Sequence, residues 1–217
     1  DRPGFAMGWL EMRVNIVPRA RVRHEVWVNL KGERFIAEDV GSPEAQEFAL
    51  RSQPGMRMAL IWDQCILEKV GAQLLLPPEK WGVDRIVAEA QRGRVLWAAD
   101  SMPELARKLG IDPDGLARTV ERYNQAVDQQ SDPDFGRRDL PVRIEQPPFY
   151  GVICQAGLLS TRDGLRVDED LRVLRHSGEP IPGLYAVGEI LGSNQFMGSA
   201  AVSGMMVGPA VALGRYL

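Results

Sequence analysis

Alternating residue types early in the chain predict β-strands. Val26 and Val28 share one face of an extended segment, and a Lys-Gly step at 31–32 leads into a second apolar stretch. Two such stretches joined by a short turn predict a β-hairpin over residues 24–39. A longer apolar run over residues 56–64 predicts a buried strand.

Capping residues predict three helices. A Ser-Pro-Glu step at 42–44 supplies an N-cap, a proline at the first helical position and an acidic first turn, so a helix should run to about Arg51. A second helix begins after a cap at 100–101 and ends at Gly110, and a third begins after Asp112. The third helix carries one apolar stripe, formed by Leu116, Val120, Tyr123 and Val127. We interpret Tyr123 in this stripe as core packing with its hydroxyl at the rim.

The last third of the chain changes from helical to strand patterns. A Pro- and Asp-rich link at 130–150 favours a domain boundary, so we expect a first domain over residues 1–145 and a second over residues 146–217. Short apolar segments between turn residues predict strands in the second part, at 151–155, 164–167, 172–174 and 184–187. A Gly- and Ser-rich loop then leads into an apolar helix that begins near 201–205.

Composition excludes several classes of function. Lys and Arg number 26 against 29 Asp and Glu, which gives a formal charge of −3 and no basic field for nucleic acid. Cys65 and Cys154 lie far apart, so we expect no disulfide framework and no zinc site, but reduced thiols in a cytoplasmic protein. With two histidines we expect no metal site. No apolar run reaches the ~20 residues of a membrane helix, so we expect no membrane span. Because the first residue is Asp, we interpret the chain as a processed product or a fragment.

Four separated stretches resemble one family of flavoproteins. They are VNLKGERFIAE at 28–38, ADSMPELARKLGID with LARTVERYNQAV at 99–127, DPDFGR with PPFYGV at 132–152, and STRDGLRVDEDLRVL with IPGLYAVGE at 160–189. Their order and spacing are similar to those of the FAD-dependent fumarate reductases, succinate dehydrogenases and 3-ketosteroid dehydrogenases. The resemblance covers residues 26–217 and implies that the chain is part of an FAD-dependent oxidoreductase.

This resemblance implies a fold of two parts. An α+β capping domain is followed by the C-terminal strands and helix of a Rossmann-like α/β flavin domain. The family's flavin domain is discontinuous, and its first half carries a GxGxxG motif that binds the pyrophosphate at a helix N-terminus. No GxGxxG follows a strand in this sequence. We therefore expect the second half of such an enzyme, with a capping domain that is incomplete at its N-terminus. A second chain that supplies the Rossmann half is an alternative.

The resemblance also indicates which residues contact FAD. The segment 186–189 matches the family's GxGE-like turn, whose glutamate lies near the ribityl or ribose hydroxyls. The N-terminus of the last helix, with a partial positive charge of about half a unit, points at the pyrimidine edge of the flavin. The expected contact residues are Gly188, Glu189, Ala201, Val202, Gly204 and Met205. The alternative is a strand, turn and helix whose glycines serve only tight packing. The isolated chain should not hold FAD tightly, because half of the cofactor's contacts are absent.

Departures from the family's substrate residues favour an apolar substrate over a dicarboxylate. The dicarboxylate reductases have an Asn-Arg step and a His before a Thr-x-Gly-Gly turn, where this sequence has Asn-Gln at 194–195 and Leu-Ser at 159–160. Their proton-donor arginine falls near Ile-Leu at 66–67, which cannot donate a proton. Ala200 replaces the tyrosine of the ketosteroid branch. The apolar residues over 196–202 suit an uncharged or steroid-like small molecule, and plain core packing of these residues is the alternative.

The reaction that the resemblance implies is hydride transfer between the flavin and a C–C single or double bond next to a carbonyl. The candidates for an acid or base are Tyr150, Ser160 and Arg162, and no two of them form a recognisable pair. Tyr150 in PPFY is more often structural. Two alternatives stay open: a non-catalytic fragment without bound flavin, and one subunit of a split flavoenzyme. Exposed apolar surface on residues 181–187 and on the last helix would favour the split enzyme.

Overall fold

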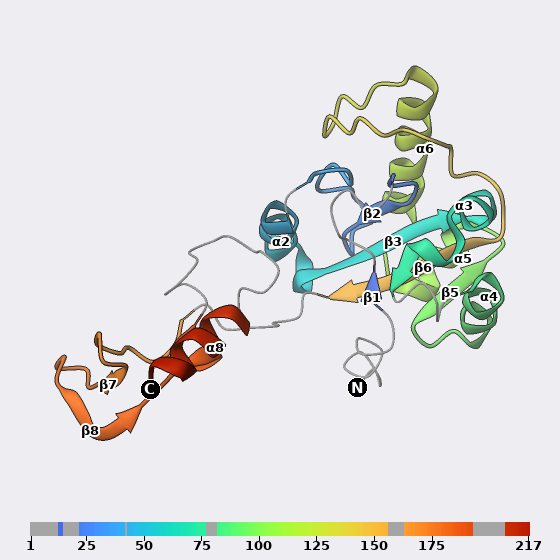
Figure 1. Cartoon of the computed structure of the whole chain (residues 1–217). Coiled ribbons are helices and arrows are strands. Elements are labelled where there is room, and N and C mark those ends of the chain that lie inside the picture. The colour runs from blue at the N-terminus through green and yellow to red at the C-terminus, as the bar shows by residue number, and fades with distance from the viewer. Residues whose placement is uncertain (1–12, 15–21, 42, 77–81, 156–162, 193–206) are drawn as a thin grey trace. The chain divides into compact units, whose positions relative to one another are not determined.

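The computed structural model describes residues 13–14, 22–41, 43–76, 82–155, 163–192 and 207–217 of the 217-residue chain (Figure 1). The chain divides into two compact units, Asp1–Ala156 and Gly157–Leu217. Each unit has its own sheet and its own cluster of buried apolar residues.

A four-stranded antiparallel sheet forms the centre of the first unit, with the strand order β2-β3-β6-β5. The strands are β2 (Val26–Val28), β3 (Arg57–Asp63), β5 (Leu96–Ala99) and β6 (Phe149–Gln155). In β3 every residue after Arg57 is buried, as expected for a continuous apolar run. The predicted strand at 56–64 is therefore confirmed. A separate two-stranded ladder pairs β1 (Arg13–Val14) with β4 (Leu75–Leu76).

Helices and loops bury the apolar residues of this sheet. The helices are α2 (Pro43–Arg51), α3 (Gln64–Val70), α4 (Val83–Arg92), α5 (Met102–Leu109) and α6 (Pro113–Gln129), with short 3-10 turns η1 (Pro54–Met56) and η2 (Gly71–Leu74). Helices α4 and α5 pack against β5, and α6 packs against α5 (Figure 1). The core includes Trp27 and Trp62, which are almost completely buried.

Local signals place α2, α5 and α6 correctly. Helix α5 begins after Ser101 and ends at Gly110, which has the left-handed conformation that favours glycine. Helix α6 begins after Asp112, whose carboxylate accepts hydrogen bonds from the next two amides after Pro113. Its predicted stripe faces the core, because Leu116, Val120 and Tyr123 are buried and Val127 packs against the same cluster.

The predicted hairpin at 24–39 is wrong. Strand β2 pairs with β3 instead, and residues 33–36 form no strand. The loop after β2 is compact, because the side-chain oxygen of Asn29 accepts hydrogen bonds from the amides of Lys31 and Glu33. Arg34 then bonds to Glu38 rather than to a neighbouring strand. Helices α3 and α4 and strand β5 were not predicted, and α4 begins after Gly82 without a side-chain cap.

The second unit contains a short β-hairpin and a helix. Strand β7 (Arg172–Leu174) pairs with β8 (Pro180–Tyr185), the 3-10 turn η4 (Gly188–Leu191) follows, and α8 spans Val207–Tyr216. The strand predicted at 172–174 is confirmed. The segment 164–167 contributes only a bridge from Val167 to Val173, and the last strand ends at Tyr185 rather than Val187. The predicted helix start at 201–205 lies outside the described residues.

The boundary between the units lies later than the predicted domain boundary after residue 145. Strand β6 pairs with β3 along its whole length and with β5 on its other edge, so it folds with the first unit, which extends to Ala156. A strand between two hydrogen-bonded neighbours cannot belong to another compact unit. The assignment of the two units to a capping domain and a flavin domain stays a prediction.

Candidate functional site

The turn η4 carries the two candidate flavin contacts that the structure describes. Gly188 has φ +80°, a left-handed conformation that glycine adopts at little cost. The next residue, Glu189, is exposed, and its carbonyl accepts a hydrogen bond from the amide of Gly192 at 2.9 Å. The backbone of the turn lies against α8, because a Cβ on Gly188 would be 3.4 Å from the Cβ of Ala210. The turn therefore presents an exposed carboxylate directly after a left-handed glycine.

A second segment, residues 164–165 near the start of the unit, contacts this turn. The amide of Leu165 donates a hydrogen bond to the carbonyl of Ile190 at 2.9 Å. A Cβ on Gly164 would lie 2.2 Å from the same carbonyl oxygen, and 2.4 Å from the carbonyl carbon of Leu191. Contacts this short leave no room for a side chain. The segment that follows candidates Ser160 and Arg162 is thus in direct backbone contact with η4.

Several predicted site residues lie outside the described residues. They are the catalytic candidates Ser160 and Arg162 and the cofactor candidates Ala201, Val202, Gly204 and Met205. Their roles stay predictions. Of the predicted set, the structure describes Gly188 and Glu189, which it brings together in η4, and Tyr150, which lies in the first unit.

Tyr150 has the surroundings of a packed core residue. Its ring stacks on Trp62 with ring centres 6.0 Å apart, and its hydroxyl donates a hydrogen bond to Oε1 of Gln64 at 2.8 Å. Burial, and then the negative charge of Glu68, raise the pKa of this hydroxyl. The arrangement agrees with the structural interpretation of the PPFY motif. It leaves the hydroxyl proton engaged with an amide rather than directed to a substrate.

The two residues near which the family's proton-donor arginine falls, Ile66 and Leu67, are also core residues. Ile66 and Leu67 lie in α3 and are fully buried in the hydrophobic cluster of the first unit. Asp63 caps this helix by accepting a hydrogen bond from the amide of Ile66. The second carboxylate oxygen of Asp63 accepts from the amides of Glu145 and Gln146. Neither apolar side chain can exchange a proton with a substrate.

A buried ionic cluster in the first unit was not predicted. The guanidinium group of Arg34 contacts Glu38 at 2.7 Å and Asp132 at 2.9 Å, and Arg137 contacts Glu38 at 3.1 Å. These four side chains are at most 5% exposed. Both guanidinium groups also lie over the ring of Tyr123. The cluster ties residues 34–38 to residues 132–137.

Charges within this ionic cluster stabilise one another. Burial lowers the pKa of Arg34, but hydrogen bonds and charges from Glu38 and Asp132 outweigh this effect and raise it above its ordinary value. A pocket of about 340 Å³ lies beside the cluster, lined by Glu33, Arg34, Thr119, Arg122, Tyr123, Asp134 and Phe135. Because its arginines and carboxylates are equal in number, this pocket carries no excess positive charge for an anionic substrate. The segments GERFIAE and DPDFGR each contain charges of both signs, but in a single sequence these charges do not identify which residues pair.

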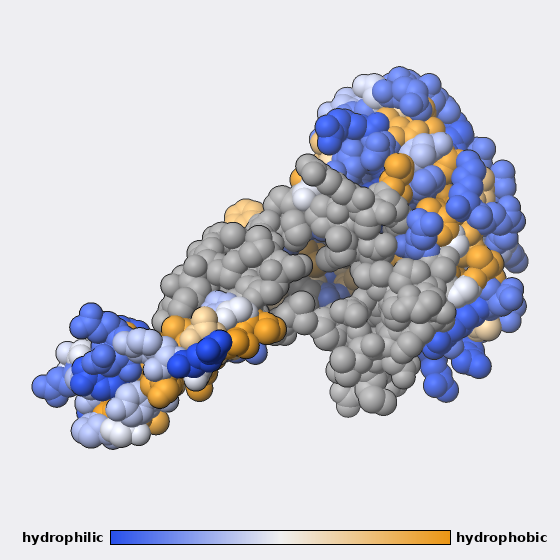
Figure 2. All heavy atoms as spheres, in the orientation of Figure 1, coloured by the Kyte–Doolittle hydropathy of each residue, from blue (hydrophilic) through white to orange (hydrophobic). Residues whose placement is uncertain are grey.

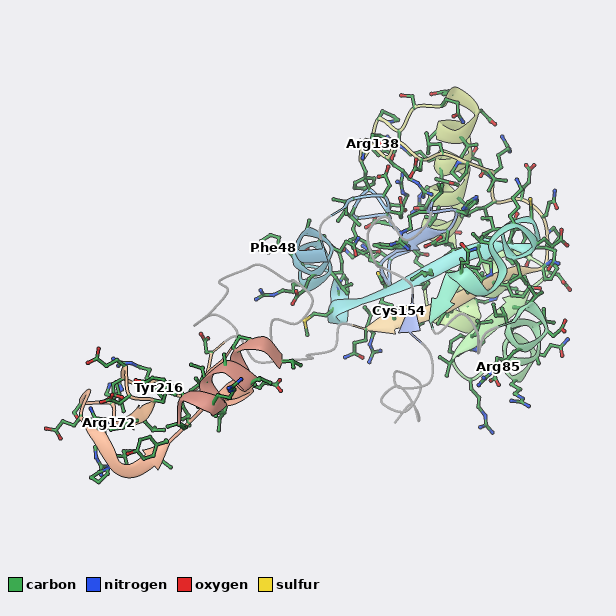
Figure 3. All side chains as sticks on the ribbon, viewed as in Figure 1. Phe48, Arg85, Arg138, Cys154, Arg172 and Tyr216 are labelled. Carbon is green, nitrogen blue, oxygen red and sulfur yellow. The ribbon has the colours of Figure 1, made fainter. Side chains whose placement is uncertain are left out.

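Apolar side chains are exposed on the second unit. Leu184 and Tyr185 of β8 are 45% and 50% exposed, and Val207 and Val211 of α8 are 68% and 58% exposed. Figure 2 shows hydrophobic surface over α8, and Figure 3 labels Arg172 and Tyr216 in this unit. Among the described residues, the buried cluster of this unit is only Val173, Ala186 and Leu191. Exposed apolar surface on these elements is the feature expected for one subunit of a split flavoenzyme.

The described ranges contain no group of three or more residues that could bind a metal ion. Within the same ranges, every helix is too short or too polar to cross a membrane.

Comparisons with known proteins agree on one family. The family model for an FAD binding domain matches residues 9–206. An NADH:acrylate oxidoreductase of Vibrio harveyi is 31% identical over 82% of this chain and 17% of its own length. A 3-oxosteroid 1-dehydrogenase of Mycobacterium tuberculosis is 30% identical over 86% of this chain and 36% of its own. The solved open conformation of a flavocytochrome c3 fumarate reductase superposes with a TM-score of 0.64 at 29% identity, covering 88% of this chain and 31% of that one. The chain therefore spans about a third or less of these proteins.

Proposed function

Because the chain belongs to the FAD binding domain family, we propose that it forms part of an oxidoreductase that transfers a hydride between flavin and a C–C single or double bond next to a carbonyl. The match over residues 9–206 is the observation that carries this proposal. Bound FAD supplies the hydride chemistry, so the tasks left to the protein are to bind it, to orient the substrate and to hold one acid or base.

Two features of the turn η4 support FAD binding there. The carboxylate of Glu189 is exposed and can accept hydrogen bonds from ribityl or ribose hydroxyls. The left-handed Gly188 lets the backbone turn sharply just before it, with α8 directly behind. We assign Gly188 and Glu189 to the cofactor, together with Ala201, Val202, Gly204 and Met205, which lie outside the described residues.

The substrate we propose is an uncharged, steroid-like molecule with a ketone next to the reacting bond. Recognition of a dicarboxylate favours arginines that bind each carboxylate in a bidentate manner. In this chain Gln195 replaces the arginine of the Asn-Arg step, and Ile66 and Leu67 are fully buried apolar residues. The similarity to a 3-oxosteroid 1-dehydrogenase supports the same substrate class. For the acid or base we favour Ser160 or Arg162 over Tyr150, whose hydroxyl is bonded to Gln64.

The test uses the longest natural polypeptide that contains these residues. We expect it to purify with a flavin absorption spectrum. After anaerobic reduction, a steroid enone should reoxidise the flavin at least about tenfold faster than fumarate or acrylate at equal concentration, since a pocket without paired arginines lacks strong contacts to a carboxylate. Absence of flavin would contradict the proposal as a whole. Fastest reoxidation by fumarate would contradict only the substrate class.

A second proposal concerns partners of the flavin site. The exposed apolar side chains of β8 and α8 support packing of these elements on a further part of a flavin domain, in the same polypeptide or in a second chain. Residues 1–217 alone should then bind FAD weakly. We would purify this chain and record its visible spectrum together with the intact mass of everything that copurifies. Stoichiometric flavin on residues 1–217 without another polypeptide would contradict the proposal.

A further inference from the structure

We propose that Gly164 is a positioning residue for the flavin-binding turn η4, and that its missing side chain sets where Glu189 lies. This inference rests on the proposed function, because η4 is assigned to FAD there. Gly164 lies outside the assigned cofactor and catalytic residues. It acts on the site through the backbone of Ile190 and Gly192.

The first observation is steric. A Cβ on Gly164 would lie 2.2 Å from the carbonyl oxygen of Ile190, 2.4 Å from the carbonyl carbon of Leu191 and 2.5 Å from the amide nitrogen of Gly192. Each of these atoms belongs to the backbone, so no side-chain rotation can relieve the overlap. Gly164 itself does not have a left-handed φ. Its backbone therefore lies outside the left-handed region that disfavours alanine, and the nearest atoms that a side chain would meet are backbone atoms of Ile190, Leu191 and Gly192.

The second observation is that η4 is held from two directions. On one side Gly188 packs against Ala210 of α8, where a Cβ would be 3.4 Å from that of Ala210. On the other side the amide of Leu165 donates a hydrogen bond to Ile190. Glu189 lies between these two contacts. A turn fixed at both ends has one position, and its carboxylate is pre-organised to accept hydrogen bonds from a ligand.

These contacts make the consequence of a methyl group at position 164 calculable. The added methyl carbon and the backbone atoms of Ile190, Leu191 and Gly192 must move apart by roughly 1 Å to reach ordinary contact distances. The hydrogen bond from Leu165 to Ile190 must then lengthen. If η4 moves this far, the carboxylate of Glu189 loses its proposed hydrogen bond from FAD. Loss of a hydrogen bond to a charged acceptor lowers the affinity for FAD by roughly ten- to a hundredfold. Misplacement of bound groups by about 1 Å also lowers a reaction rate by about a hundredfold.

The matched control is Gly214→Ala. Gly214 lies in α8 of the same unit, and a Cβ there would meet nothing within 4 Å. Both variants add the same methyl group in place of a hydrogen atom. They differ in whether that group overlaps the backbone of η4.

The experiment measures the dissociation constant for FAD by flavin fluorescence in the longest natural polypeptide that contains these residues. We expect Gly164→Ala to raise it at least about tenfold and Gly214→Ala to leave it within about twofold. Equal affinities for wild type and Gly164→Ala would overturn the inference. A wild-type protein that binds no FAD would reject the proposed function, and the inference with it.

A measurement on the wild type keeps the inference testable if Gly164→Ala does not fold. Backbone amide exchange is followed by mass spectrometry with and without FAD. Saturating FAD should slow exchange about tenfold or more in residues 163–167 as well as in 188–192, because the two segments share the Leu165 to Ile190 hydrogen bond. The hairpin tip at 175–179 should not change. Slower exchange at 188–192 without any change at 163–167 would overturn the proposed coupling.

Discussion

The two compact units differ in how far each buries its own apolar and charged residues. In the first unit, helices and loops cover the sheet, so that Trp27, Leu60 and Trp62 are at most 1% exposed. The ionic cluster around Arg34 is also buried. In the second unit, apolar side chains of β8 and α8 are exposed, and Arg172 pairs with Asp168 at the surface.

Most of the buried apolar surface lies in the first unit, whereas the proposed cofactor residues lie in the second. The first unit supplies its own hydrophobic driving force, whereas the described part of the second leaves several large apolar side chains exposed. Every assigned cofactor residue lies in the second unit. Each prediction below pairs a change in the first unit with a chemically matched change in the second.

The largest contrast should come from the arginines. Arg34→Met leaves the buried carboxylates of Glu38 and Asp132 without their shared partner, so we expect a loss of about 4 kcal/mol in the free energy of unfolding. The measurement is urea denaturation followed by tryptophan fluorescence, because all five tryptophans lie in the first unit.

The matched variant is Arg172→Met. Its pairs with Asp168 and Asp170 are partly exposed, so screening by water and salt should make the loss much smaller than that for Arg34→Met. Far-ultraviolet circular dichroism is needed here, since the second unit has no tryptophan. Similar losses for the two arginines would remove the contrast in charge burial.

Truncated leucines should give the next largest contrast. Leu60 is fully buried in β3, so Leu60→Ala should remove about 3 kcal/mol through lost burial and a cavity. Leu184 in β8 is 45% exposed, and Leu184→Ala should change the free energy of unfolding by about 0.5 kcal/mol or less. A loss at Leu184 as large as that at Leu60 would show that β8 is covered in the intact protein.

Acid should act on the ionic cluster with a smaller effect. Burial raises the pKa of Asp132, but hydrogen bonds and charge from Arg34 and bonds from the amides of Arg137 and Asp134 outweigh it, so the pKa is lowered. A lowered pKa in the folded state contributes stability above the unfolded value of about 3.9, and this is lost as the pH falls through the folded value. We therefore expect the free energy of unfolding to fall as the pH falls through that window.

Asp132→Asn tests the origin of this acid effect. The variant should start less stable at neutral pH and lose less than the wild type below about pH 4, because its amide does not titrate. Asp168→Asn is the counterpart in the second unit. That carboxylate is near the surface, so its effect should diminish in high salt. An acid loss in Asp132→Asn as large as in the wild type would assign the effect to other groups.

Helices α5 and α6 and strand β3 were predictable from residues within or next to each element. The proline in the first turn of α5, the stop at Gly110 and the cap at Asp112 are local signals that mark the bounds of α5 and the start of α6. The apolar run of β3 is likewise readable without partners. The family motifs predicted the flavin chemistry, because four ordered stretches are much more specific than any single one.

Pairings between distant residues were not predictable from the same signals. Strand β2 pairs with β3, about 30 residues later in the chain, with Trp27 opposite Leu60 and both side chains in the buried cluster, and the turn after β2 does not indicate this partner. Arg34 and Asp132 are separated by 98 positions, and neither charge indicates its partner in a single sequence. The contact of Gly164 with η4 is a backbone approach and leaves no pattern of residue types beyond the glycine itself.

The smallest contrast concerns single tyrosine hydroxyls. The hydroxyl of buried Tyr123 donates a hydrogen bond to the carbonyl of Val142 at 3.2 Å, so Tyr123→Phe should remove about 1 kcal/mol at neutral pH. Tyr185→Phe, on the exposed strand β8, should remove almost nothing. Burial raises the pKa of Tyr123 to about 12. A raised pKa gives stability that is complete below the unfolded value of about 10 and is lost as the pH rises to the folded value. The wild type should therefore lose stability between about pH 10 and 12 relative to Tyr123→Phe, and parallel curves for the two proteins would show that this hydroxyl is solvated.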